Sequence, residues 1–250
     1  MSKLIDQQQL CLQLLSSDEH YYGEFGRKYL SNSDIGALLK NPKDFKKHIP
    51  DNAAFAKGRY FHQLILEPEK AEGWEFVGVA SRNSKAYKEF CADNDLSFAM
   101  LEKERDEIKS LVDTMLGNFF MFEDIRDDAC EYEVPAIKKI AGEMWKGKAD
   151  IVHPDKIIDL KTTGDISAFK WSAKKYNYDS QAFLYQEMFG KPLVFYVIDK
   201  STAMLGVFEP SPDFIDGGEA KVVRAIEQYR KFFGDNPTDD INEYIIQEFL

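Results

Sequence analysis

The chain has 250 residues, 44% of them hydrophobic and 30% charged, a composition that suits an ordinary globular protein with a sizeable core. Its net charge of −11 argues against a protein that coats nucleic acid nonspecifically, although residues 38–60 are locally rich in lysine. The three cysteines are far apart and odd in number, which argues against a disulfide framework and against a cysteine-rich zinc or iron–sulfur site.

The N-terminal segment does not read as a secretion signal, because Asp6 and three glutamines interrupt the apolar run that a signal peptide requires. No stretch of the sequence approaches the ~20 consecutive apolar residues of a membrane span. These observations predict a cytoplasmic protein without a membrane partner.

Residues 1–125 are expected to be mainly helical. A Ser-Asn-Ser-Asp start at residue 31 predicts one capped helix. Residues 58–68 predict a short apolar helix that Pro68 ends, and residues 100–122 predict a longer helix with a broad apolar face.

Strand patterns replace the helical ones near residue 130. The expected elements are strands at 130–140, 142–154 and 155–163, a helix at 167–190, strands at 192–200 and 203–210, and a helix at 213–233. This order predicts an α/β fold in which helices flank a mixed sheet. The expected organisation is a single domain with a helical part at 1–125, a sheet-and-helix core at 126–235 and an acidic tail at 236–250.

Three charged residues interrupt the second and third of these strands. Asp159 and Lys161 are two residues apart, so their side chains share one face of a strand, and Asp150 lies on the strand before it. A short connection can bring both carboxylates together. Carboxylates suit Mg²⁺ or Mn²⁺, and a neighbouring lysine can orient a water molecule or stabilise a phosphate. The alternative is a solvated strand face, which is common for an Asp-x-Lys pair.

The set of motifs resembles the PD-(D/E)XK nuclease superfamily. Asp150 and the run Asp159-Leu160-Lys161 match its D…(D/E)-x-K motif, with Asp in the middle position. Further segments resemble the branch of exonuclease VIII (RecE) and the phage alkaline exonucleases. They are the opening helix near residue 31, which resembles the family's Ser-x-Ser-x-Leu pattern, the Gly-x-x-x-His segment at 58–62, the stretch after Lys161, and the Gln-x-x-x-Tyr motif at 181–185. Together they span residues 28–235 in the order of the family.

The resemblance implies a restriction-endonuclease-like core and assigns roles to individual residues. It implies metal ligation by His62, Asp150, Asp159 and the Leu160 carbonyl, and a catalytic role for Lys161. Gln181 and Tyr185, four apart on one helix face, are implied to line the site. Glu133 matches the acidic residue of the first core strand, although Glu131, two residues away, leaves this assignment open.

Several other residues carry two interpretations. Lys57 and Arg59 are candidates for contacts to DNA phosphates or for solubilising surface charge. Ser33 is a candidate for a 5′-phosphate contact or a helix cap. Trp171, Tyr176 and Tyr178 are expected to be aromatic core, with stacking on DNA ends as the alternative.

The function implied by the resemblance is a Mg²⁺-dependent exonuclease, with Mn²⁺ as a substitute, that digests one strand of linear double-stranded DNA. The expected direction is 5′ to 3′, leaving 3′ overhangs for recombination in a bacterial or phage-infected cell. The resemblance also implies a homo-oligomeric ring of three or four subunits and a single-strand-annealing partner. The alternatives are an endonuclease, a single-strand-specific repair nuclease, or a catalytically silent DNA-binding module.

Overall fold

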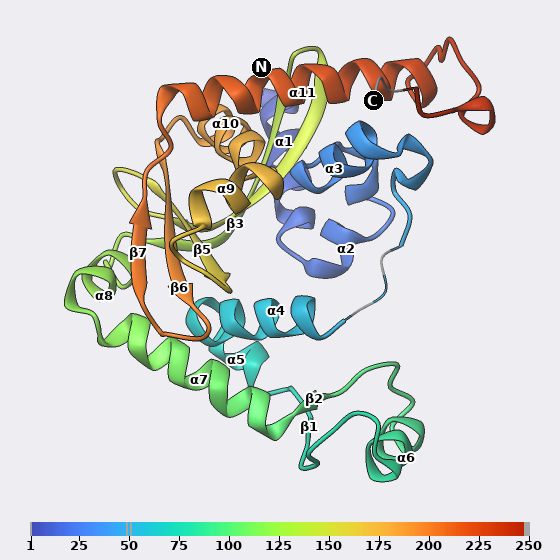
Figure 1. The fold of residues 1–250 in the computed structure, drawn as a ribbon. Coiled ribbons are helices and arrows are strands. Elements are labelled where there is room, and N and C mark those ends of the chain that lie inside the picture. Colours follow the sequence, from blue (N-terminus) through green and yellow to red (C-terminus); the bar gives the residue numbers. More distant parts are fainter. Residues whose placement is uncertain (1, 49, 51, 248–250) are drawn as a thin grey trace.

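A five-stranded mixed sheet forms the centre of the computed structural model, which describes residues 2–48, 50 and 52–247 (Figure 1). The strands, in spatial order, are β3 (Glu131–Ile140), β4 (Glu143–Val152), β5 (Ile157–Thr163), β6 (Leu193–Asp199) and β7 (Leu205–Phe208). The pair β5–β6 is parallel and the other three neighbouring pairs are antiparallel. The expected α/β class with a mixed sheet is confirmed.

Helices cover both faces of the sheet. The N-terminal helices are α1 (Ser2–Leu15), α2 (Asp18–Tyr22), α3 (Asn32–Lys40), α4 (Ala53–Leu66), α5 (Pro68–Ala71) and α6 (Lys85–Asp93). The later ones are α7 (Glu102–Gly117), α8 (Phe119–Ile125), α9 (Phe169–Lys175), α10 (Tyr178–Phe189) and α11 (Pro212–Phe232). Short 3₁₀ turns lie at Gly26–Lys28, Pro42–Asp44 and Ile241–Glu243.

Alternate side chains of β5 point into two separate hydrophobic clusters, as the two-residue period of a strand requires. Ile158 and Leu160 pack with residues of α4, α7 and α8 on one face. Ile157 packs with residues of α3, α9, α10 and α11 on the other face. Asp159 and Lys161 have the parity of Ile157, and this places them on the α10 side of the sheet.

The helix expected at 167–190 is two helices. Asn177 adopts a left-handed conformation with φ of 60°, which ends the helical path between α9 and α10. Pro68 begins α5 at its first turn, and α4 starts at Ala53 because Asn52 Oδ1 accepts hydrogen bonds from two N–H groups of its first turn.

A small separate unit around residues 76–101 lies at the start of α7, beyond α4 and α5 as seen from the central sheet (Figure 1). There β1 (Phe76–Val77) pairs in parallel with β2 (Met100–Leu101), and α6 connects them across a minor cluster that contains Tyr87. Two-residue strands carry no periodicity, and the sequence did not predict them. Within the described part of the chain, none of the helices combines the length and apolar character needed to span a membrane.

Candidate active site

The site lies where β4 and β5 separate. Their ladder consists of Ile151 with Ile158 and Val152 with Ile157, next to a short turn. Beyond it, Asp150 Oδ2 accepts a hydrogen bond from the backbone N–H of Leu160 at 2.8 Å. A buried N–H needs a partner, and here a carboxylate replaces the strand that has moved away. The separation therefore brings Asp150, which is 8% exposed, to the edge of β5.

His62 reaches the same residue, Leu160, from α4. Its Nε2 lies 2.8 Å from the Leu160 carbonyl oxygen and 3.7 Å from Asp150 Oδ2. With Nε2 protonated, the imidazole donates to that carbonyl. Three of the groups to which the family resemblance assigned metal ligation, His62, Asp150 and the Leu160 carbonyl, thus lie together.

Asp159 and Lys161 form the second half of the site, on the α10 side. Asp159 is 1% exposed, its Oδ1 accepts a hydrogen bond from Gln181 Nε2 at 2.6 Å, and its carboxylate is ion-paired with Lys161. Burial raises the pKa of Asp159, and Lys161 opposes that shift. Burial lowers the pKa of Lys161, but the charges of Asp159 and Asp150 outweigh it and raise the pKa above its usual value. Lys161 is therefore an ammonium at neutral pH.

Glu133 enters the site from β3. Tyr132 pairs with Ile151 and Val134 with Ala149, so the register sets Glu133 opposite Asp150. Burial, followed by the charge of Asp150, raises the pKa of Glu133 to about 7.

The alternative acid, Glu131, pairs with Val152 at the exposed end of β3. Glu133 also lines the same cavity as His62. The geometry therefore favours Glu133 of the two glutamates that the sequence left open.

Tyr185 of α10 packs against the backbone of β4 near Asp150. Its hydroxyl donates to the Lys148 carbonyl at 2.9 Å, and the ring is buried between α10 and β4. Gly147 makes this close approach possible, because a Cβ there would lie 2.9 Å from Tyr185 Cε1. The structure thus places Tyr185 against the backbone of β4, where it positions the strand that carries Asp150.

A cavity of about 580 Å³ opens beside His62. Its walls combine aromatic, acidic and basic side chains: Asp18, Tyr22, Phe55, Arg59, His62, Gln63, Glu67 and Glu133. Phe55, Arg59 and His62 recur along α4 at intervals of four and three residues, so the helix presents them on one face.

The sequence did not identify Asp18, which lines this cavity, or its ion-pair partner Lys148. Asp18 of α2 lies between two lysines, with Oδ1 2.6 Å from Lys148 Nζ and Oδ2 2.8 Å from Lys70 Nζ. Although its partial burial raises the pKa of Asp18, the hydrogen bonds from both lysines lower it below its usual value. Lys148 is also 3.7 Å from Glu133. Lys148 has the strand parity of Asp150, a signal available in the sequence, whereas nothing local marks Asp18.

The three predicted DNA contacts lie in different surroundings. Arg59 is an exposed residue of the cleft. Ser33 is exposed in the first turn of α3, with its Oγ 2.9 Å from Ser31 Oγ; the helix cap is Ser31 itself.

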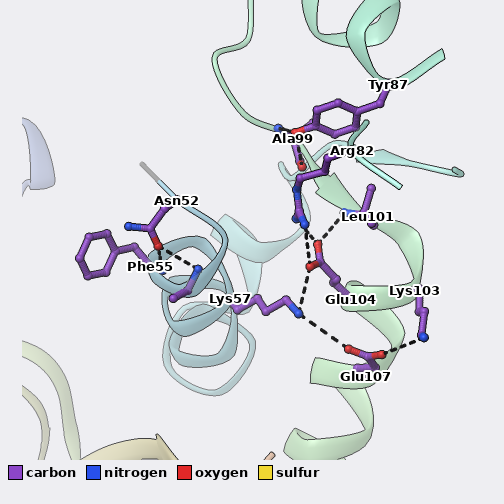
Figure 2. Close-up of polar contacts among 11 residues, drawn as sticks. Asn52, Phe55, Lys57, Arg82, Tyr87, Ala99, Leu101, Lys103, Glu104 and Glu107 are labelled. Carbon is purple, nitrogen blue, oxygen red and sulfur yellow. Dashed lines mark hydrogen bonds and ion pairs between the residues drawn. The ribbon is translucent and has the colours of Figure 1, made fainter. Parts of the chain in front are cut away.

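Lys57 lies on another side of α4, where it faces α7. Its Nζ is 3.0 Å from Glu104 and 3.8 Å from Glu107, beside the pair formed by Arg82 and Glu104 (Figure 2). The geometry gives Lys57 a role in holding α7, and its DNA contact stays a prediction.

The donor set fits a divalent metal. Among the described residues, no three His, Cys, Asp or Glu side chains are close enough to form a ready-made site. Asp159 Oδ2 is nevertheless buried without a hydrogen-bond donor, apart from its ion pair with Lys161. Two carboxylates and a carbonyl are suitable oxygen ligands for Mg²⁺ or Mn²⁺, and an imidazole beside them suits Mn²⁺. His62, Asp150, Asp159 and the Leu160 carbonyl are the residues that would hold it.

The fold and the site define a nuclease-like α/β protein of the PD-(D/E)XK class. Residues 27–235 match the family model described as "PDDEXK-like domain of unknown function (DUF3799)". The chain belongs to this family, and the resemblance to the superfamily is confirmed.

One solved structure shares the fold over most of the chain. A crystal structure from Eubacterium rectale described as a putative exonuclease is 16% identical, covers 94% of this chain and 95% of its own, and gives a TM-score of 0.62. The crystal structure of SSO0001 is 15% identical over 76% of this chain and 83% of its own, with a TM-score of 0.31, too low to indicate the same fold. No curated protein shows significant sequence similarity to the chain.

Proposed function

We propose that the protein is a Mg²⁺-dependent exonuclease that hydrolyses phosphodiester bonds in one strand of linear double-stranded DNA. The observation that carries this proposal is the convergence of His62, Asp150 and the Leu160 carbonyl at the gap between β4 and β5, with Asp159 and Lys161 on the adjoining strand. This arrangement supplies both metal ligands and a cation for the attacking water in a chain of the PDDEXK-like family.

In this proposal, each residue of the site has a separate role in the hydrolysis. A bound Mg²⁺ would neutralise charge on the scissile phosphate and activate a water molecule. Lys161, as an ammonium, holds that water or a phosphate oxygen in line with the bond. Gln181 holds the Asp159 carboxylate in place through its 2.6 Å hydrogen bond. Glu133, across from Asp150 on β3, accepts or releases a proton.

The finer features of the proposal come from the family resemblance. They are 5′-to-3′ polarity, 3′ overhangs, a role in recombination with an annealing partner, and a ring of three or four subunits. The neighbour from Eubacterium rectale, described as a putative exonuclease, supports exonucleolytic action.

An exposed apolar patch on α8 supports subunit association. Phe119, Phe120 and Phe122 of this helix are 77%, 58% and 42% exposed. Adjacent exposed phenylalanines of this kind are typical of a protein–protein contact. Multi-angle light scattering of the wild type and of a Phe119→Asp variant would test the ring.

The test of the activity uses linear and covalently closed circular duplex DNA, each with Mg²⁺ or with EDTA. We expect loss of the linear form alone, and only with Mg²⁺. Duplexes labelled at one end and blocked at the 5′ or the 3′ terminus then give the polarity. Cutting of closed circles would indicate an endonuclease, digestion of single strands alone a repair nuclease, and DNA binding without cleavage at any divalent metal a silent binding module.

A further inference from the structure

An aromatic path leads from Lys161 to the surface of the molecule. Lys161 Nζ lies 4.8 Å from the centre of the Tyr178 ring, and the rings of Tyr178 and Tyr176 are 6.1 Å apart. Tyr178 is largely covered, whereas Tyr176 is 58% exposed. The exposed Tyr176 ring is therefore connected to Lys161 through the ring of Tyr178.

The corner that carries these rings is held rigidly. Asn177, between them, has a φ of 60°, the left-handed conformation that asparagine adopts more readily than most residues. The Asn177 carbonyl accepts hydrogen bonds from Asn32 Nδ2 at 3.1 Å and from Ser180 Oγ at 3.0 Å. The Asn177 side chain accepts a third, through Oδ1, from Lys221 Nζ at 3.0 Å. These hydrogen bonds fix the directions in which Tyr176 and Tyr178 leave the backbone.

The chain segment before Tyr176 is rich in lysine, unlike the chain as a whole. Residues 168–178 contain Lys170, Lys174 and Lys175 and no acidic residue, in a protein with a net charge of −11. Lys175 Nζ lies 5.8 Å from the centre of the Tyr176 ring. An exposed ring beside a lysine is the combination that binds single-stranded nucleic acid, since the ring stacks on a base and the lysine contacts a phosphate.

Trp171 provides the contrast on the same helix. It is 69% exposed, but it lines a separate cavity, where Glu209 and Asp213 stand beside Lys170 and Lys174. The two carboxylates offset the two lysines there, and no ring links Trp171 to Lys161 among the described contacts. Exposure alone therefore does not select Tyr176; its contact with Tyr178, which lies against Lys161, and its neighbour Lys175 do.

We infer that Tyr176 stacks on a base of the DNA strand that Lys161 holds for cleavage, while Lys175 contacts a phosphate of the same strand. This inference rests on the proposed function and adds to it a specific nucleotide contact outside the metal site. Stacking on a frayed base keeps the strand end single-stranded as it approaches Lys161.

The experiment is a double-mutant cycle between Tyr176 and the base. Values of kcat/KM with Mg²⁺ are compared for the wild type, Tyr176→Ala, Tyr176→Phe and Trp171→Ala. The substrates are intact linear duplexes and duplexes with one abasic site, moved singly through the first nucleotides of the digested strand. Binding of the same DNA in EDTA is followed by fluorescence anisotropy.

We expect Tyr176→Ala to lower kcat/KM on intact DNA by about tenfold, the effect of losing one base–aromatic stack. Tyr176→Phe keeps the ring and Trp171→Ala removes the control ring, so both should match the wild type. On the duplex whose abasic site falls at the stacked position, Tyr176→Ala and wild type should be equal.

An equal loss on intact and on every abasic DNA, or no loss at all, would overturn the inference while leaving the nuclease in place. A wild type that cleaves nothing would overturn the proposed function instead. The anisotropy cycle would then decide on its own whether Tyr176 stacks on a base.

Discussion

Asp150 Oδ2 and the backbone nitrogen of Leu160 lie 2.8 Å apart across the opening between β4 and β5. The Asp150 carboxylate therefore has a structural and a chemical role. It satisfies a buried N–H group, and it lies 3.7 Å from His62 Nε2 in the candidate metal site. Removing the side chain would leave an unpaired buried donor, whereas an amide retains an acceptor oxygen. An Asn substitution at this position therefore separates the structural role from the chemical one.

Asp150→Asn should abolish metal-dependent cleavage and leave the fold intact. We expect the rate on linear duplex DNA to fall by about 10³-fold or more, because a neutral amide is a poor ligand for Mg²⁺. Stability should change by no more than about 1 kcal/mol, since the hydrogen bond to Leu160 persists. Cleavage rates and urea unfolding measure the two effects, with Asp155→Asn in the exposed turn as the matched control. Cleavage near the wild-type rate would refute the site.

Lys161→Ala should stop cleavage and also weaken the metal-free protein. The substitution leaves Asp159, which is 1% exposed, without its ion-pair partner. A buried charge that loses its partner costs about 3 kcal/mol. We expect a lower melting temperature in EDTA and a partial recovery in Mg²⁺, which would supply the missing positive charge. The exposed Lys200 provides the control Lys200→Ala; equal melting of both variants in EDTA would contradict the pairing.

The order of strands and closing helices was predictable because it depends on local periodicity. The alternation from residue 131 to Ile140 and the apolar run of β6 identify strands without any knowledge of their partners. The division between α9 and α10 was not predictable, because Asn177 is held by Asn32 and Lys221, which are distant in sequence. A single-residue change of conformation fixed by remote contacts leaves no periodic signal.

The sequence also predicted only part of the candidate site. Spacing within strands identified Asp159 and Lys161, and the family motifs identified His62 and Gln181. In the structure, His62 contacts the Leu160 carbonyl and Gln181 contacts Asp159, both on β5. The separation of β4 from β5 and the contact of Asp18 with Lys148 could not be foreseen. Both depend on how elements far apart in the chain pack, which no local pattern records.

Lys146 should make stability rise with pH. Burial lowers its pKa to about 8, from an ordinary value near 10.5 in the unfolded chain. Between these values the unfolded state binds more protons than the folded state, so stability increases as pH rises. The predicted gain attributable to Lys146 is up to about 3 kcal/mol over this range.

Urea unfolding of the wild type and of Lys146→Met at pH 7.5 and pH 9.5 measures about 2 kcal/mol of this gain, as the difference between the two proteins. Lys146→Met should reduce the rise in stability between the two pH values. Lys139→Met, at an exposed position of β3, should leave it unchanged. An identical pH dependence in the wild type and in Lys146→Met would show that Lys146 is not the group responsible.

Gly147→Ala should disturb the support beneath Asp150. The added methyl group would lie 2.9 Å from both Tyr185 Cε1 and Met188 Sδ. The methionine can move, but Tyr185 is held by its hydrogen bond to the Lys148 carbonyl. Overpacking of this kind costs about 1–3 kcal/mol. We expect lower stability and slower cleavage together, because the displaced tyrosine releases the strand that carries Asp150.

A second substitution identifies Tyr185 as the cause. Tyr185→Leu in the Gly147→Ala background makes room for the methyl group, so the double variant should be more stable than the sum of the two single effects predicts. Gly217→Ala in α11 is the control, since a Cβ there meets nothing within 4 Å. Strictly additive effects at Gly147 and Tyr185 in urea unfolding would mean that the ring does not limit this position.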